Sequence, residues 1–213
     1  MQAIPNGAPV APTDRTTRHQ VLSAGLRIAD RSGPEAITMR AVAGEVGLTP
    51  MALYHHVRDR RDLVSGIVEQ LLDEMADPWD CPGPWTERLR FLFLQLRQLG
   101  HLHPRLAPLI LHHNRHSGAI RRIELAGLQA LSDAGVPSDH LPRVQAMVWT
   151  MQLGFVVREA LGHFRDQPPG GADRDAAAAL ALIEQYVTWA AAHPDRAVPD
   201  DPTTRWSRYW DDD

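Results

Sequence analysis

Apolar residues recur at the three-to-four-residue spacing of helices along most of the chain, and no stretch shows the alternation that strands require. The first apolar stripe lies within residues 18–31, where Thr16 or Thr17 can cap the helix and Gly33-Pro34 ends it. Its members are Val21, Leu22, Ala24, Gly25, Ile28 and Ala29. The pattern predicts an all-α fold of about nine helices.

Two short helices follow, joined by a tight turn. Thr38 is placed to cap the first, and Gly47 supplies the left-handed residue that ends it. Thr49 caps the second, which begins at Pro50 and extends to about His56. The inward positions of the pair are Met39, Val42, Ala43, Val46, Leu53 and Val57. The spacing predicts a helix-turn-helix over residues 38–57.

A longer helix is expected over about 60–76, capped by Asp59 with Asp62 three positions on, a variant of the capping box. Residues 77–84 are rich in helix breakers and form the best domain boundary. Beyond it, apolar periodicity predicts helices near 85–99, 104–113, 117–134, 139–165 and 174–192. We therefore divide the chain into a disordered arm (1–14), a helix-turn-helix domain (15–62), a connecting helix (63–76), a linker (77–84), a larger helical domain (85–193) and an acidic, aromatic tail (194–213).

Charge is distributed unevenly. The chain contains no lysine and carries −4 overall, yet residues 15–62 hold eight arginines against five acidic residues and are therefore +3, which leaves −7 for the rest. Such an asymmetry is expected when one end of a protein meets phosphate and the other does not.

Other classes of protein lack support in the sequence. No apolar run approaches the ~20 residues of a membrane span, and the start of the chain does not resemble a signal peptide. The single cysteine, Cys81, fits a reducing cytoplasm. No nucleophile elbow, phosphate loop or dinucleotide fingerprint is present, so we expect no enzyme and no cofactor. The alternative is a helical metal-binding protein or enzyme that uses a histidine cluster, which comprises His101, His103, His112, His113 and His116. That cluster lacks the usual metal-ligand spacing, so we expect no metal.

The stretch from Ile37 to Val64 (ITMRAVAGEVGLTPMALYHHVRDRRDLV) resembles the signature of the TetR family of transcriptional regulators, and the match covers about 18–72. The Leu-Tyr-His-His-Val form is nearer to the tetracycline-repressor branch. The resemblance implies that the second short helix enters the major groove of double-stranded operator DNA. The residues expected at that interface are Arg40, Thr49, Pro50, Met51, Ala52, Tyr54, His55, His56 and Arg60.

The resemblance also implies roles within that set. Arg40, Tyr54, His56 and Arg60 would touch the sugar-phosphate backbone, which sets orientation. Met51 and Ala52 would favour thymine methyl groups over a guanine clamp, so direct base readout is expected to be modest. The structural alternatives are that Tyr54 belongs to the core, and that Arg58, Arg60 and Arg61 form a solvated charged turn. A helical dimer that never touches DNA is the remaining alternative for the whole chain.

The resemblance also implies that the larger domain dimerises and binds a small molecule. The dimer would form through the last two long helices, about 139–165 and 174–192, where the alanine run 176–181 permits close approach or simply favours helix formation. Candidates to line a ligand cavity are Phe93, Leu96, Trp149 and Phe155, unless these are ordinary core. Ile110 stands where a histidine would be expected for tetracycline, so the effector is expected to be another molecule. The homodimer would bind a palindromic operator as a repressor and be released by the effector, with the fourth helix as the lever.

Overall fold

The computed structural model describes residues 17–111 and 118–193, and within these ranges it contains helices and no strands. The α-helices are α1 (Arg18–Ser32), α2 (Met39–Glu45), α3 (Pro50–Leu53), α4 (Arg60–Leu72), α5 (Trp85–Leu102), α6 (Ala107–Leu111), α7 (Gly118–Asp133), α8 (Leu141–Ala160) and α9 (Gly171–Ala192), with short 3-10 turns η1 (Pro34–Ala36) and η2 (Pro78–Asp80). The all-α expectation is confirmed. The arm 1–14 and the tail 194–213 lie outside the described residues. No helix in the described ranges has the length and apolarity to cross a bilayer.

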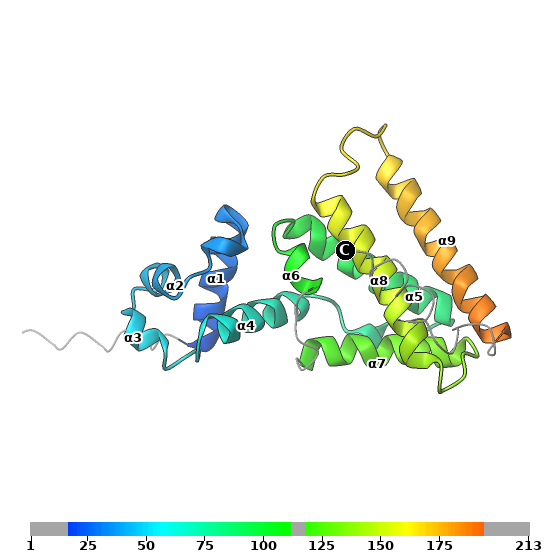
Figure 1. The fold of residues 1–213 in the computed structure, drawn as a ribbon, viewed down its shortest axis with the longest axis horizontal. Coiled ribbons are helices and arrows are strands. Elements are labelled where there is room, and N and C mark those ends of the chain that lie inside the picture. Colours follow the sequence, from blue (N-terminus) through cyan, green and yellow to red (C-terminus); the bar gives the residue numbers. More distant parts are fainter. Residues whose placement is uncertain (1–16, 112–117, 194–213) are drawn as a thin grey trace, which may run out of the picture.

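Helices α1 to α4 occupy one end of the molecule and α5 to α9 the other, with α4 leading from the first group to the second (Figure 1). We call α1 to α3 with the start of α4 the reading head, and α5 to α9 the body. One cluster of buried apolar side chains continues from the reading head into the body, and a second cluster joins α5, α7, α8 and α9 at the far end. The linker 77–84 therefore separates helices but does not interrupt the apolar core.

The helices of the reading head are capped at their N-termini by the residues predicted from the sequence. The side chains of Thr17, Thr38, Thr49 and Asp59 each accept a hydrogen bond from the backbone N–H three residues on. Gly47 has φ of 70°, the left-handed conformation predicted for the turn between α2 and α3. The local chemistry of the chain therefore determines where these helices begin.

Helix α3 is shorter than predicted. Regular helix ends at Leu53, and residues 54–56 continue as a tighter turn in which Tyr54, His55 and His56 each donate to the carbonyl three residues earlier. The carbonyl of His56 accepts from Arg18 Nη1 at 2.6 Å. This long-range bond uses an acceptor at the end of the turn, so the chain turns away toward α4 instead of extending α3.

Helices α1 and α4 approach each other closely because two glycines face the partner helix. A Cβ at Gly66 would lie 2.7 Å from Leu22 Cδ2, and one at Gly25 would lie 2.5 Å from Ile67 Cδ1. Both distances are shorter than normal contacts between carbon atoms. Helix α4 thereby packs directly on α1 and links the reading head rigidly to the body.

Candidate nucleic-acid interface

Helix α3 presents large side chains to solvent at one end of the molecule. Met51 is 76% exposed and Tyr54 is 52% exposed, whereas Leu53 is completely buried and Val57 nearly so. The buried pair fixes α3 against α2 and the rest of the reading head. The exposed pair projects from the opposite side of α3, which lies at the outer end of the molecule (Figure 1). This arrangement excludes the structural alternative that Tyr54 is core.

Most of the remaining residues expected at DNA are also exposed. Thr49, Pro50, His55, Arg40 and Arg60 are exposed, and Ala52 and His56 are half-buried. The structure therefore brings the second helix and its N-terminus together as an accessible surface, which a groove-binding helix requires.

Arg40 and Arg60 differ in what their guanidinium groups already bind. Arg60 Nε donates to the carbonyl of Ile37 at 2.8 Å, and its Nη2 donates to that of Pro34 at 3.2 Å. Arg60 therefore braces the η1 segment against α4. Arg40, in the first turn of α2, makes no hydrogen bond or ion pair with the described residues, so its charge is available to an external anion.

Asp62 organises the end of this surface. Its carboxylate accepts from Arg18 Nη2 at 2.9 Å and from the backbone N–H of Arg58 at 2.8 Å, and its side chain is 16% exposed. The Arg18 hydrogen bond, with help from the Arg58 N–H, lowers the pKa of Asp62 below its ordinary value. The predicted capping-box variant is thus only half right, since Asp59 caps α4 but the Asp62 side chain binds the N–H of Arg58 and not that of Asp59.

Glu45 neutralises part of the positive charge of the reading head at the side of α1. It pairs with Arg31 at 2.8 Å and with Arg27 at 3.5 Å, and the Arg31 hydrogen bond is the main reason why the pKa of Glu45 is lowered. The Arg61 side chain makes no hydrogen bond or ion pair with the described residues, and the Arg58 side chain makes only a 3.7 Å pair with Asp62. In the described reading head, the arginines without an acidic partner are therefore Arg40 and Arg61, together with Arg60, whose side chain bonds only to neutral carbonyls.

Comparison with known proteins identifies this segment. Residues 21–67 match the bacterial regulatory proteins of the tetR family. Residues 21–67 therefore form a DNA-binding domain of the TetR type. The curated relatives whose sequences match are named as HTH-type transcriptional regulators.

Individual proteins share part of their sequence or their fold with this chain. The transcriptional repressor DrrR1 of Streptomyces coeruleorubidus is 30% identical over 94 residues, which is 44% of this chain and 35% of DrrR1, so the match spans about a third of that repressor. BioQ of Mycobacterium smegmatis is 25% identical with a TM-score of 0.72 over 82% of this chain and 99% of its own. ActR of Streptomyces coelicolor, solved in complex with actinorhodin, is 18% identical with a TM-score of 0.71 over 84% of this chain and 99% of its own. At 18% identity, the similarity to ActR shows a shared fold and no more.

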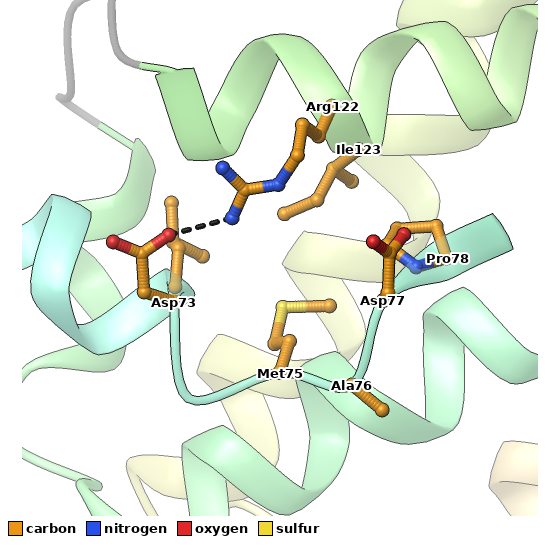
Figure 2. Close-up of a pocket in the computed structure, with 8 residues that line it drawn as sticks. Asp73, Met75, Ala76, Asp77, Pro78, Arg122 and Ile123 are labelled. Atoms are coloured by element: carbon orange, nitrogen blue, oxygen red, sulfur yellow. Dashed lines mark hydrogen bonds and ion pairs between the residues drawn. The ribbon is translucent and has the colours of Figure 1, made fainter. Parts of the chain in front are cut away.

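The four residues expected to line a ligand cavity lie in or against the larger apolar cluster. Phe93 and Leu96 are completely buried, and Trp149 and Phe155 pack against that cluster. The ring of Phe93 meets that of Phe155 edge to face at 5.6 Å. A cavity of about 250 Å³ lies elsewhere, between the end of α4, the α4–α5 connection and α7, and none of the four lines it (Figure 2). No pattern in the sequence indicates this cavity, because its walls come from segments about fifty residues apart.

The histidines considered as a metal cluster bind different carboxylates. His101 Nε2 lies 3.1 Å from Glu159, while His103 lies between Asp30 and Glu74. The other three members, His112, His113 and His116, lie outside the described residues. Within 17–111 and 118–193, no three metal-ligating side chains gather around one point.

Proposed function

We propose that this chain is a ligand-responsive repressor of the TetR family that binds a palindromic operator as a homodimer. The observation that carries the proposal is the exposure of Met51 and Tyr54 at α3, together with Arg40 on α2, which is exposed and has no polar partner among the described residues. A protein that kept this surface for packing would bury such side chains, whereas a groove-binding helix must expose them. The assigned contact residues are Arg40, Thr49, Pro50, Met51, Ala52, Tyr54, His55, His56 and Arg60.

The roles within this surface follow from what each group has left to bind. Arg40 supplies a free guanidinium for a phosphate, and Tyr54 supplies a hydroxyl on a rigid ring. Arg60 already donates through two of its nitrogens, so its contribution to a phosphate is limited to the remaining Nη1. Met51 offers an apolar contact for a thymine methyl group.

The proposed dimer uses α8 and α9. Three large apolar side chains on these helices are exposed in the single chain: Met147 at 51%, Leu182 at 57% and Trp189 at 40%. An isologous interface would cover them and would place two copies of α3 about 34–36 Å apart, one turn of duplex DNA. Leu182→Glu should therefore convert the dimer to a monomer in sedimentation equilibrium, whereas Leu94→Glu, at an exposed leucine of α5, should not.

The proposed effector is a small molecule held by the body. ActR, which shares the fold, has been solved with such a molecule bound, and this supports an effector here without naming it. Binding would favour a conformation in which the two copies of α3 are wrongly spaced, and the affinity for DNA would fall accordingly.

The test of the interface begins with duplexes selected from a random pool by the full-length protein. Fluorescence anisotropy then compares the wild type with Arg40→Ala and Tyr54→Ala, and with Arg90→Ala on α5 as the matched control. We expect each interface variant to raise the Kd about tenfold and Arg90→Ala to leave it unchanged. If neither interface variant weakens binding at moderate salt, the outer face of α3 is not the DNA interface. If the protein selects and binds no duplex at all, the alternative of a helical dimer that does not bind DNA is correct.

A further inference from the structure

The cavity at the end of α4 lies where the reading head joins the body. We call it the joint pocket. Its volume is about 250 Å³, and it is partly open (Figure 2). Its walls come from the last residue of α4, the connection to α5 and the second turn of α7, and they are Leu72, Asp73, Met75, Ala76, Asp77, Pro78, Arg122 and Ile123.

Negative charge exceeds positive charge around the joint pocket. Arg122 Nη2 pairs with Asp73 at 2.6 Å, and the Asp77 carboxylate lies on the opposite side of the pocket (Figure 2). The pKa of Arg122 is raised, first by the Asp73 hydrogen bond and further by the charges of Asp77 and Glu69. Asp77 accepts the N–H of Trp79, through Oδ1 at 3.0 Å, and it acts on Arg122 only across the pocket, without a direct ion pair to any described residue. A positively charged ligand would supply the missing partner.

The rest of the lining is apolar. Met75 extends into the pocket from below, and Ile123 faces it from α7 (Figure 2). Leu72 and Pro78, both buried, complete the apolar walls. A ligand that fills the pocket must therefore carry a compact apolar body beside its charge, because a bare inorganic cation would leave these walls without contacts.

We propose that the joint pocket binds a small organic cation, an amine whose ammonium group pairs with Asp77 and whose apolar body lies between Met75 and Ile123. This places an effector site at the junction of the two domains, outside the aromatic cluster of Phe93 and Phe155. Its regulatory consequence rests on the proposed function, whereas the binding itself does not.

The joint pocket adjoins the bonds that hold α4 on α7. Glu69 Oε1 accepts from the backbone N–H groups of Gly118 at 2.8 Å and Ala119 at 3.4 Å, and one turn further along both helices Asp73 pairs with Arg122. We call this set the α4–α7 clasp. A ligand in the pocket contacts Asp73 and Arg122, so its affinity differs between the conformation in which the α4–α7 clasp is formed and the one in which it is broken. Binding therefore shifts the position of α4.

The first test measures binding directly on the full-length protein. Methionine methyl groups are labelled with ¹³C, the Met75 signal is assigned with Met75→Leu, and three probes of similar shape are titrated: benzylamine, benzyl alcohol and benzoate. We expect benzylamine to shift the Met75 signal saturably, benzyl alcohol to bind at least tenfold more weakly, and benzoate to cause no shift. The Met51 signal serves as the internal control. Equal binding of the three probes, or none by benzylamine, overturns the proposal.

The second test assigns the charge partner. Asp77→Asn keeps an acceptor for the N–H of Trp79 but removes the carboxylate charge, and it should weaken benzylamine binding at least tenfold. The matched control is Asp80→Asn, an exposed residue of the same η2 turn, which should bind benzylamine as the wild type does. Unchanged binding by Asp77→Asn, with an unchanged Met75 signal before titration, would overturn the assignment of Asp77.

Failure of the pocket and failure of the proposed function give different results. The affinity for a selected duplex is measured by anisotropy with and without saturating benzylamine. If benzylamine binds saturably and also weakens the affinity for the duplex, the result supports both the joint pocket and the proposed function. If Met75 reports binding and the duplex affinity is unchanged, the pocket stands and its effector role is refuted. If no duplex is bound under any condition, the repressor assignment fails while the methyl titration still decides the pocket.

Discussion

The outer face of α3 and the joint between the reading head and the body use polar groups in opposite ways. The side chains of Tyr54, at the end of α3, and of Arg40, on α2, are exposed and make no hydrogen bond or ion pair with the described residues. At the joint, His103 Nδ1 lies 3.0 Å from both oxygens of Asp30 on α1, and its Nε2 lies 3.4 Å from Glu74. Arg105 adds a 2.7 Å bond to the carbonyl of Arg31.

The difference separates recognition from positioning. Groups that await an external partner must stay unpaired in the free protein, because bonds within the protein would first have to be broken. Groups that fix the direction of the reading head must be satisfied internally, since a rigid head transmits a movement of the body to the DNA. Substitutions on the α3 face should therefore change DNA binding more than stability, and those in the core and at the joint should do the reverse.

The largest expected effect comes from the buried side of α3. Leu53→Ala should lower the free energy of unfolding by about 2–5 kcal/mol, because it leaves a cavity beneath the helix. Met51→Ala, two residues earlier and exposed, should change it by less than about 0.5 kcal/mol. Chemical denaturation measures both. A similar loss in the two variants would show that α3 has no distinct inner and outer faces.

The next effect concerns Asp62, which holds the turn after α3. Asp62→Asn weakens the bonds to Arg18 and to the N–H of Arg58 and should cost about 1–2 kcal/mol, less than a fully buried pair because Arg18 is partly exposed. Thermal unfolding measures the loss, with Asp139→Asn, an exposed residue before α8, as the control. If Asp62→Asn unfolds at the same temperature as the wild type, Asp62 does not stabilise the reading head.

The pH dependence of that difference has a definite sign. Because the folded protein lowers the pKa of Asp62, its contribution to stability is complete above the ordinary carboxyl value of 3.8 and is lost as the pH falls through the lowered folded value. The gap in unfolding free energy between wild type and Asp62→Asn should thus shrink on acidification below that value. A gap that grows in acid would contradict the assigned cause of the shift.

The sequence predicts those features of the reading head that depend on near neighbours. Thr38, Thr49 and Asp59 cap helices, and Gly47 turns the chain, because each acts on backbone within three or four residues. The early end of α3 could not be predicted in this way, since it involves Arg18 from 38 residues away.

Contacts between segments that are distant in the sequence cannot be predicted from apolar periodicity or from motifs. The pairing of His103 with Asp30 joins positions 73 residues apart, and the joint pocket requires Asp77, in the α4–α5 connection, to share a cavity with Arg122 on α7. The sequence locates these residues on elements, but the packing of α4 on α7 decides which of them share a site. For this reason the cavity expected at Phe93 and the cavity found at the joint differ.

A smaller effect is expected at the joint. His103→Leu removes the imidazole that lies between Asp30 and Glu74 and leaves two carboxylates without it, which should cost about 1 kcal/mol. Hydrogen exchange should become faster at the C-terminal turn of α1 and stay unchanged in α8. The control is His163→Leu, an exposed histidine after α8. Unchanged protection of α1 in His103→Leu would mean that the joint does not depend on this bridge.

The smallest effect decides the role of Arg61, which is either a phosphate contact or part of a solvated turn. Arg61 is exposed and makes no bond with the described residues, so Arg61→Ala should change the unfolding free energy by less than about 0.5 kcal/mol. If its guanidinium meets a phosphate, the slope of log Kd against log salt concentration should fall by about one unit, because one fewer counterion is released on binding. Titrations of a selected duplex at several salt concentrations measure the slope. An unchanged slope would assign Arg61 to the solvated turn and confine the phosphate contacts to the remaining basic groups around α3.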